Sequence, residues 1–194
     1  MIRAVMGGSF DPVHNGHVAL VHRVLSDDLA DHVHVIPAAR SPHKSDCLAT
    51  SAHRLAMVHL AFAETARVTV EDLEVLRAGP SFTVDTLEAL ARRYPEDELR
   101  LLCGADNLAG LADWHRPERL LDLAELVVFA RPAEGIPPQP AESPDGRRVH
   151  RVDDFHHEVS STGIRAMLAA GKPVDTLVPP QVAAYIGTHR LYRT

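Results

Sequence analysis

Two histidines lie three residues apart directly after a pair of glycines, and these residue types together can bind phosphate. The glycines, Gly7 and Gly8, follow a short apolar run, and the histidines, His14 and His17, flank a predicted helix start near Asn15. Glycines let the backbone approach a ligand closely, and the first turn of a helix offers free N–H groups to an anion. Because both imidazole rings can face one point and donate protons to oxygens, the segment predicts a polyphosphate site. The alternative is an ordinary strand-to-helix turn that carries two surface histidines.

A second group of anion-binding residues occurs later in the sequence. Ser160, Ser161 and Thr162 open a predicted helix, and Arg165 follows one turn inside it. Hydroxyl groups, free N–H groups and a guanidinium at one helix start favour a phosphate ligand. The same string is also a good helix cap followed by an exposed arginine.

Two further segments carry groups suited to an anionic substrate. His43 and Lys44 lie in the loop after the second predicted strand, where they either contact a ligand or form a solvated basic loop. Ser81, Phe82 and Thr83 open another predicted helix. A helix start with exposed N–H groups can hold a single carboxylate, so this segment is a candidate carboxylate site.

The elements that must position these residues alternate along the chain. Apolar runs predict strands over 2–6, 32–37, 67–71, 99–103 and 126–130, and three-to-four spacing predicts helices over 18–29, 52–63 and 84–94. Thr50 or Ser51 is expected to cap the second of these helices, and Ser81 or Thr83 the third. The alternation predicts an α/β fold, a Rossmann-like doubly wound parallel sheet with helices on both faces. Such sheets bind ligands at the carboxyl ends of their strands, where the glycine pair lies.

The last third of the chain is expected to add a small helical part to this sheet. Five prolines between positions 131 and 148 predict a surface excursion at about 132–146 rather than a domain linker. A last strand is predicted over 147–152, a helix over 161–170 that ends at Gly171, and another helix from Pro180 to His189. We therefore expect a single domain over residues 1–194, with a C-terminal helical subregion at about 160–194.

Composition limits the classes of protein that the chain can represent. Its 194 residues are 45% hydrophobic, which is enough for a sizeable core. No apolar run is long enough to span a bilayer, and the first strand lacks the features of a signal peptide, so we expect a cytoplasmic protein without a membrane partner. The net charge of −6 argues against a nucleic-acid partner. Cys47 and Cys103 follow no metal or disulfide pattern, so no metal site built by the protein is expected.

The string G-G-S-F-D-P-V-H-N-G-H, residues 7–17, resembles the (H/T)-x-G-H nucleotidyltransferase superfamily. Within it, a histidine at His14 in place of threonine is similar to the bacterial nicotinate-nucleotide adenylyltransferases. Further similarities follow in order: S-P-H-K at 41–44 resembles the family's P-P-H-K, P-S-F-T at 80–83 its P-S-Y-T, C-G-A-D at 103–106 its I-G-x-D, and S-S-T-G-I-R at 160–165 its S-S-T-x-I-R. Trp114, the R-P pair at Arg131 and residues 177–192 also match the family. Several motifs in one order are more specific than any of them alone.

The resemblance implies a reaction and assigns the candidate residues to it. The reaction transfers the adenylyl group of ATP to the 5′-phosphate of nicotinate mononucleotide, giving deamido-NAD and pyrophosphate in NAD biosynthesis, with Mg²⁺ carried by ATP. The catalytic residues would be His14, His17, Lys44 and Arg165. ATP would be bound by Gly7, Gly8, Ser9, Phe10, His14, Gly16, His17, Gly104, Asp106, Ser160, Ser161, Thr162 and Arg165. Nicotinate mononucleotide would be bound by Ser9, His43, Lys44, Phe82, Thr83, Asp106, Trp114 and Arg131.

Other functions stay open at this point. The acceptor could be nicotinamide mononucleotide, because the same helix start at Ser81 decides between an acid and its amide. It could also be phosphopantetheine, although enzymes of that kind usually carry threonine at the position of His14. Outside the enzymes, the chain could be a nucleotide sensor that has kept the binding pocket and lost turnover. A homo-oligomer is compatible with the sequence.

Overall fold

The chain folds around a parallel β-sheet. The computed structural model describes residues 1–39, 47–77, 79–105, 110–129, 149–152, 154–155 and 157–193. Within them the strands are β1 (Ile2–Gly8), β2 (His32–Pro37), β3 (Val68–Val70), β4 (Glu98–Gly104), β5 (Ala124–Phe129) and β6 (Val149–Val152). They lie in the order β3-β2-β1-β4-β5-β6, and every neighbouring pair is parallel. The predicted Rossmann-like doubly wound sheet is confirmed.

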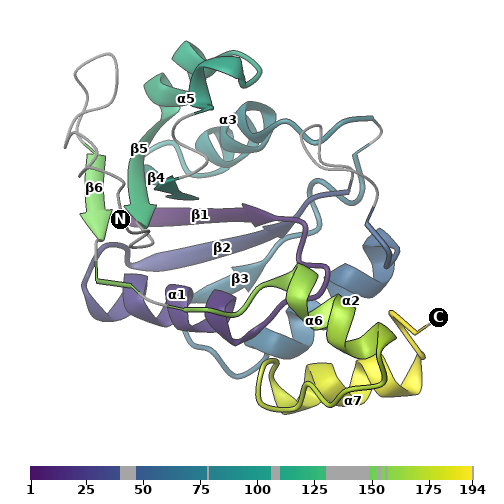
Figure 1. Ribbon diagram of the computed structural model, residues 1–194. Coiled ribbons are helices and arrows are strands. Elements are labelled where there is room, and N and C mark those ends of the chain that lie inside the picture. The colour runs from purple at the N-terminus through teal and green to yellow at the C-terminus, as the bar shows by residue number, and fades with distance from the viewer. Residues whose placement is uncertain are drawn as a thin grey trace.

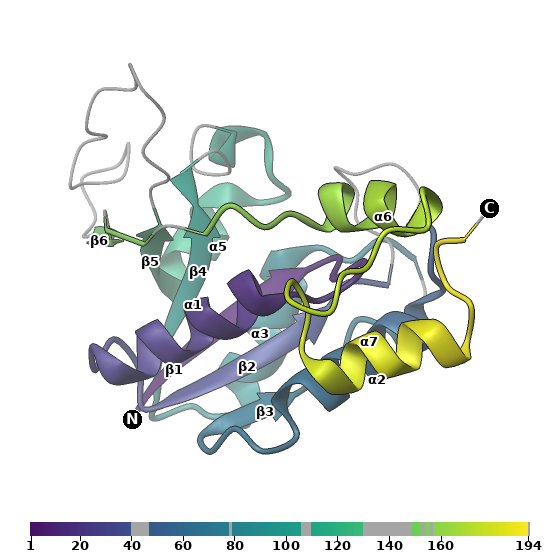
Figure 2. The ribbon, with the colours of Figure 1, turned by 60° about the horizontal axis from the view of Figure 1, so that its bottom comes forward.

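Helices cover both faces of this sheet (Figures 1 and 2). One face is covered by α1 (Asn15–Ser26), α2 (Ser51–Phe62), α6 (Ser161–Ala169) and α7 (Pro180–Thr188). The other is covered by α3 (Thr83–Arg93), the short turn η1 (Leu111–Asp113) and α5 (Pro117–Leu123). The sequence patterns predicted these helices to within a few residues, except for η1 and α5, which they missed.

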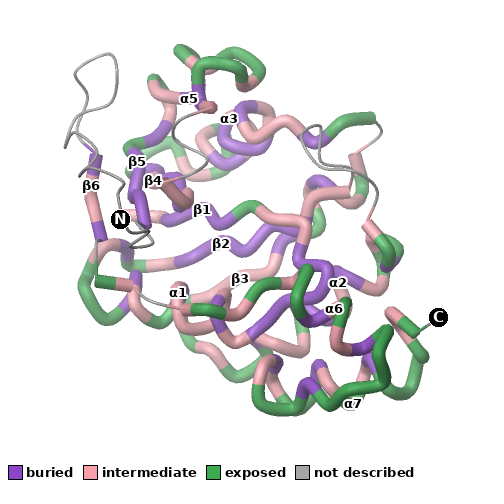
Figure 3. The backbone as a smooth tube through the Cα atoms, viewed as in Figure 1, coloured by how far each residue is buried: buried purple, intermediate pink, exposed green. Residues whose placement is uncertain are grey.

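Each strand sends successive side chains into two separate cores, because side chains alternate across a strand. Ala4 and Met6 of β1 pack in the core beneath α1, α2, α6 and α7, whereas Val5 packs in the core with α3 and α5. Figure 3 shows the resulting concentration of buried backbone in the middle of the sheet. Burial on both faces explains why these strands are almost uninterrupted apolar runs in the sequence.

The order of the strands creates a crevice beside β1. The chain builds outwards from β1 to β2 and β3, and then returns to place β4 on the other side of β1. The connections therefore reverse direction between β1 and β4, and doubly wound sheets bind their ligands at the carboxyl ends of such strands. The glycine pair ends β1 at this point.

The helix caps agree with the predictions in one case and not in the other. Thr50 caps α2, and its side chain accepts a hydrogen bond from the backbone N–H of His53. For α3 the predicted caps, Ser81 or Thr83, are wrong: the N-cap is Phe82, and no side chain caps the helix. The reason is that the Ser81 hydroxyl accepts a hydrogen bond from the N–H of Ala39 instead, at 3.1 Å.

Two sequence-based expectations concern parts of the chain beyond this core. The predicted excursion at about 132–146 lies outside the described residues. Among the helices that the structure describes, none is long and apolar enough to cross a membrane.

Candidate active site

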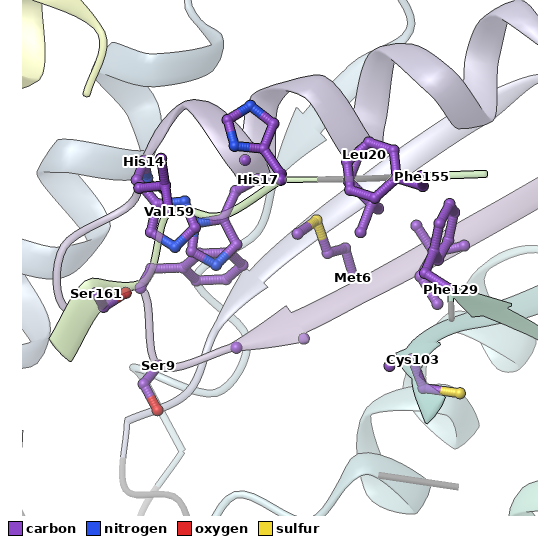
Figure 4. Close-up of a pocket in the computed structure, with 17 residues that line it drawn as sticks. Met6, Ser9, His14, His17, Leu20, Cys103, Phe129, Phe155, Val159 and Ser161 are labelled. Atoms are coloured by element: carbon purple, nitrogen blue, oxygen red, sulfur yellow. Dashed lines mark hydrogen bonds between the residues drawn. The ribbon is translucent and has the colours of Figure 1, made fainter. Parts of the chain in front are cut away.

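A pocket of about 300 Å³ opens at the carboxyl ends of β1 and β4 (Figure 4). Nine of the residues predicted to bind ATP line it: Gly7, Gly8, Ser9, Phe10, His14, Gly16, His17, Gly104 and Ser161. These residues come from two strands, the loop after β1 and the starts of two helices. The structure therefore brings together segments from opposite ends of the sequence at the predicted place.

The two predicted histidines lie against each other at the start of α1. Their rings are stacked, with centroids 3.7 Å apart and planes 30° apart. The backbone N–H of His14 donates to Nδ1 of His17 at 3.1 Å. Because Nδ1 accepts this bond, the neutral His17 ring carries its proton on Nε2. His14 is the N-cap of α1, so both imidazoles lie where the N–H groups of the helix start also favour an anion.

The loop between β1 and α1 is tightly packed around these rings. Phe10 is 2% exposed, adopts a left-handed backbone with φ of 48°, and packs edge-on against His17 with centroids 4.9 Å apart. A Cβ on Gly8 would lie 3.1 Å from the Phe10 ring, and one on Gly16 would lie 3.1 Å from the His14 ring. Glycine at both positions therefore allows the backbone to pack closely against these two rings, whereas the predicted close approach of Gly7 and Gly8 to a ligand stays a prediction.

The far end of the pocket is apolar and aromatic. Phe129, at the end of β5, packs edge-to-face against Phe155, with centroids 5.5 Å apart. Met6, Leu20 and Leu102 complete this end, and Figure 4 shows Leu20, Phe155 and Phe129 grouped away from His14 and Ser161. The pocket therefore has an end suited to a flat apolar ring and an end suited to phosphate.

The start of α6 adjoins the pocket, but most of its predicted anion-binding groups bond within the protein. Ser161 lines the pocket, and its hydroxyl donates to the Pro12 carbonyl at 2.9 Å. Ser160 caps α6 by accepting from the N–H of Gly163 at 3.1 Å. Arg165 donates to the Asp11 carbonyl at 2.7 Å and to the Thr162 hydroxyl at 3.3 Å. In this arrangement α6 holds the loop after β1.

The predicted carboxylate-binding residues form a separate group at the start of α3. The Phe82 ring stacks on His115, with centroids 4.3 Å apart, and the half-buried Trp114 packs against the core beneath α3. Phe82, Thr83 and Trp114 do not line the 300 Å³ pocket. The structure thus places the ATP candidates and these residues in two neighbouring regions of the sheet edge.

A buried carboxyl group, which no sequence motif predicted, contacts the start of α3 in this second region. Glu74 is 5% exposed and accepts a hydrogen bond from the Thr86 hydroxyl at 2.7 Å. Burial raises the pKa of Glu74, although hydrogen bonds from Thr86 and Ser81 oppose that effect. Glu74 therefore braces the first turn of α3 from below.

Four predicted site residues, His43, Lys44, Asp106 and Arg131, lie outside the described part of the chain. Three residues that line the pocket were not predicted from the sequence: Phe129, Phe155 and His157. The available signal for His157 was its place three residues before Ser160, in the segment that leads into α6. Among the described residues, no group of three or more His, Cys, Asp or Glu side chains is placed to hold a metal ion.

Comparison with known proteins identifies the class that this fold and site define. Residues 5–167 match the cytidylyltransferase-like family model, so the chain is a nucleotidyltransferase. It is 40% identical over 192 residues to a protein of Gemmatimonas aurantiaca named "Probable nicotinate-nucleotide adenylyltransferase", with 97% of this chain and 91% of that protein covered. A Pseudomonas aeruginosa protein of the same name is 39% identical over 206 residues, with 97% and 96% covered. The chain belongs to the nicotinate-nucleotide adenylyltransferase family.

A solved structure supports the fold independently of close sequence similarity. The nicotinic acid mononucleotide adenylyltransferase of Plasmodium falciparum, complexed with NaAD, superposes with a TM-score of 0.82 at 18% identity. The match covers 98% of this chain and 97% of that one. The complete sheet and its helices therefore share one architecture with that protein.

Proposed function

We propose that this enzyme transfers the adenylyl group of ATP to the 5′-phosphate of nicotinate mononucleotide, giving deamido-NAD and pyrophosphate. The observation that carries the proposal is the stacked His14 and His17 pair at the start of α1, directly beside an aromatic pocket. Family membership supports the same reaction.

The two ends of the pocket suit the two ends of ATP. A purine is flat and apolar, so the Phe129 and Phe155 rings provide a suitable surface for adenine. The imidazoles provide donors for phosphate oxygens, and the N-terminal end of α1 provides a dipole that favours their negative charge. ATP would thus lie with its base between β5 and the segment that leads into α6, and with its phosphates over the loop after β1.

The chemistry needs positioning and charge stabilisation more than proton transfer. The second pKa of a phosphate monoester is about 6, so the attacking phosphate is mostly a dianion at neutral pH. One of its oxygens forms a bond to the α-phosphorus of ATP while the bond to the pyrophosphate oxygen breaks. His14 and His17 would stabilise the charge that develops during this exchange. Lys44 and Arg165 remain the other predicted catalytic residues.

The start of α3 is the proposed site for the nicotinate carboxylate. Because no side chain caps this helix in the described structure, the N–H groups of its first turn suit an anion. Trp114 precedes His115, which stacks on Phe82, and packs against the same core, so it offers an aromatic face to a pyridinium cation. Ser9, His43, Asp106 and Arg131 complete the predicted contacts with the mononucleotide.

Mg²⁺ is proposed to arrive as part of the substrate, bound to the phosphates of ATP. Mg²⁺ prefers oxygen ligands and often reaches an enzyme on a nucleotide. The described side chains that line the pocket are imidazoles, hydroxyls, a thiol and apolar groups, which fits an ion whose ligands come from ATP. A cytoplasmic location and assembly into a homo-oligomer stay predictions.

One assay tests the proposal against its alternatives. Pyrophosphate release is measured with ATP and Mg²⁺ and, in turn, nicotinate mononucleotide, nicotinamide mononucleotide and phosphopantetheine. We expect rapid release with the first, slow release with the second and none above background with the third. Preference for either of the other two acceptors would replace the proposed substrate, and no release with any of them would indicate a nucleotide sensor.

A further inference from the structure

A tyrosine near the C-terminal end bonds directly to the loop that carries the glycine motif. The Tyr192 hydroxyl donates to Oδ1 of Asp11 over 2.8 Å, across 181 positions of sequence. In Figures 1 and 2 the segment after α7 runs beside the start of α2 and the end of α6, which places its end at this side of the sheet. A segment far from the motif in sequence therefore contributes to its surroundings.

Asp11 is a buried carboxylate that joins several segments. It is 4% exposed, and its two oxygens accept hydrogen bonds from the N–H groups of Leu48 at 2.8 Å and Ala49 at 3.1 Å. Nη1 of Arg165 lies 3.9 Å from Oδ2 of Asp11. A buried carboxylate is costly unless its oxygens are satisfied, so the Tyr192 hydroxyl completes a set of donors that this charge needs.

The backbone at Tyr192 adopts an energetically unfavourable conformation, which the surrounding contacts must stabilise. Arg190 has a φ of 52° and Tyr192 a φ of 63°, both in the left-handed region that side chains other than glycine disfavour. Such conformations persist only where surrounding contacts determine them. Here the contacts are the packing of Leu191 and Tyr192 on the core and the bond to Asp11.

The position of Asp11 matters because the rest of its loop approaches the pocket. The carbonyls of Asp11 and Pro12 accept hydrogen bonds from Arg165 and Ser161, and His14 follows two residues later. A shift of Asp11 would therefore also displace the start of α1 and the imidazoles of His14 and His17.

We propose that Tyr192 is a positioning residue for the adenylyl transfer, which acts by fixing Asp11 and with it the loop after β1. The inference rests on the proposed function for its kinetic part. Burial and the bond to Asp11 raise the pKa of Tyr192, so its hydroxyl remains a donor throughout the neutral pH range.

The test compares Tyr192→Phe with Tyr185→Phe. Both variants lose one hydroxyl and one hydrogen bond, because Tyr185 bonds to Nδ1 of His53 at 2.9 Å, between α7 and α2. Only Tyr192 contacts the loop. We expect Tyr192→Phe to lower kcat about tenfold with KM values for both substrates within about threefold, as for a small misplacement of reacting groups. We expect Tyr185→Phe to keep the wild-type kcat, and a thermal melt of each variant shows whether both remain folded.

Amide hydrogen exchange gives a readout that does not depend on activity. The Leu48 and Ala49 amides donate to Asp11, so their exchange should accelerate in Tyr192→Phe and stay unchanged in Tyr185→Phe. In a double-mutant cycle, Tyr192→Phe should lower kcat little further once Asp11→Ala is present, since Asp11→Ala removes the acceptor of the Tyr192 hydroxyl.

The outcomes separate the two proposals. A wild-type enzyme that releases no pyrophosphate refutes the proposed function, and with it the kinetic part of this inference. An active wild type with normal kcat in Tyr192→Phe refutes the inference alone, whether or not amide exchange changes. Equal losses of kcat in the two tyrosine variants, or additive losses with Asp11→Ala, also refute it, because Tyr192 would then act only through general stability.

Discussion

The guanidinium of Arg54 donates a 2.7 Å hydrogen bond from α2 to the carbonyl of Ser9, in the loop after β1. The same side chain donates to the carbonyls of Ala38, at 2.6 Å, and Ala39, at 2.9 Å, and to Ala49 at 3.3 Å. Arg54 is 1% exposed, so one buried cation joins the end of β2, the loop after β1 and the start of α2 through backbone carbonyls.

Arg54→Met should destabilise the protein strongly. The substitution keeps much of the side-chain volume but leaves buried carbonyls without donors, so we expect the free energy of unfolding to fall by about 2 to 5 kcal/mol. Urea unfolding measures this change. The control is Arg23→Met on α1, where the arginine pairs with Asp27 and Asp154 at the surface and little change is expected. Similar losses in both variants would show that burial of Arg54 is not the cause.

His17→Ala should remove turnover while the fold survives. If His17 donates to the phosphate charge that develops in the transition state, kcat should fall about a hundredfold or more, with smaller changes in KM. Steady-state pyrophosphate release measures both. His53→Ala, which removes an imidazole that bonds to Tyr185 outside the pocket, should leave kcat near wild type. Near-normal turnover of His17→Ala would remove this residue from the mechanism.

Trp114→Ala should weaken the binding of nicotinate mononucleotide and of nicotinamide mononucleotide equally. The two rings are cationic, so loss of stacking and cation–π contact should cost about 1 to 3 kcal/mol with either substrate. The wild-type preference for the acid, which we expect to be about thirty- to a thousandfold, should therefore persist in the variant. Specificity constants for both substrates in both enzymes measure this. A changed preference in Trp114→Ala would mean that the indole, and not the start of α3, reads the carboxylate.

Stability should depend on pH through Glu71. Nδ1 of the buried His34 lies 2.9 Å from Oε1 of Glu71, and Arg93 lies 3.2 Å away. The hydrogen bond with His34, assisted by the Arg93 charge, lowers the pKa of Glu71 below its ordinary value of 4.5 against the opposing effect of burial. A carboxyl whose pKa is lowered by folding stabilises the fold above its unfolded pKa, and the stabilisation is lost as the pH falls through the folded pKa.

Glu71→Gln should therefore flatten the decline of stability in acid. Urea midpoints measured from pH 7 to pH 3 should fall less in Glu71→Gln than in wild type, and Glu64→Gln, at an exposed position after α2, serves as the control. Parallel curves for wild type and Glu71→Gln would contradict this assignment.

The sheet could be predicted because its strands are buried on both faces. Val33, Val35 and Ile36 of β2 serve both cores, which leaves an apolar run that the sequence displays directly. The helix α5 could not be found in this way, because seven residues are too few for a period of 3.6 to emerge. The prediction of the α3 cap was wrong because the Ser81 hydroxyl accepts a hydrogen bond from Ala39, a partner 42 residues away that no local pattern reveals.

The site was predictable where its geometry is local. His14 and His17 are three residues apart at one helix start, so their contact follows from helix geometry. Phe155 and His157 reach the same pocket through the long connection between β6 and α6, and no spacing rule relates them to β1. The side chain of Arg165 has the right chemistry for phosphate, but the Asp11 carbonyl competes for its donors, and that competition appears only in three dimensions.

Gly16 is a pocket residue at which substitutions that confer resistance to an inhibitor are disfavoured. Any side chain at this position would place its Cβ 3.1 Å from the His14 ring and 3.3 Å from Cγ of His157, so an imidazole would have to move by a few tenths of an ångström. A compound that packs on the bare α-carbon of Gly16 therefore rests on an atom that cannot gain bulk without disturbing His14. Resistance to such a compound is therefore expected at lining positions other than Gly16, such as Leu20 or Phe155 at the apolar end of the pocket.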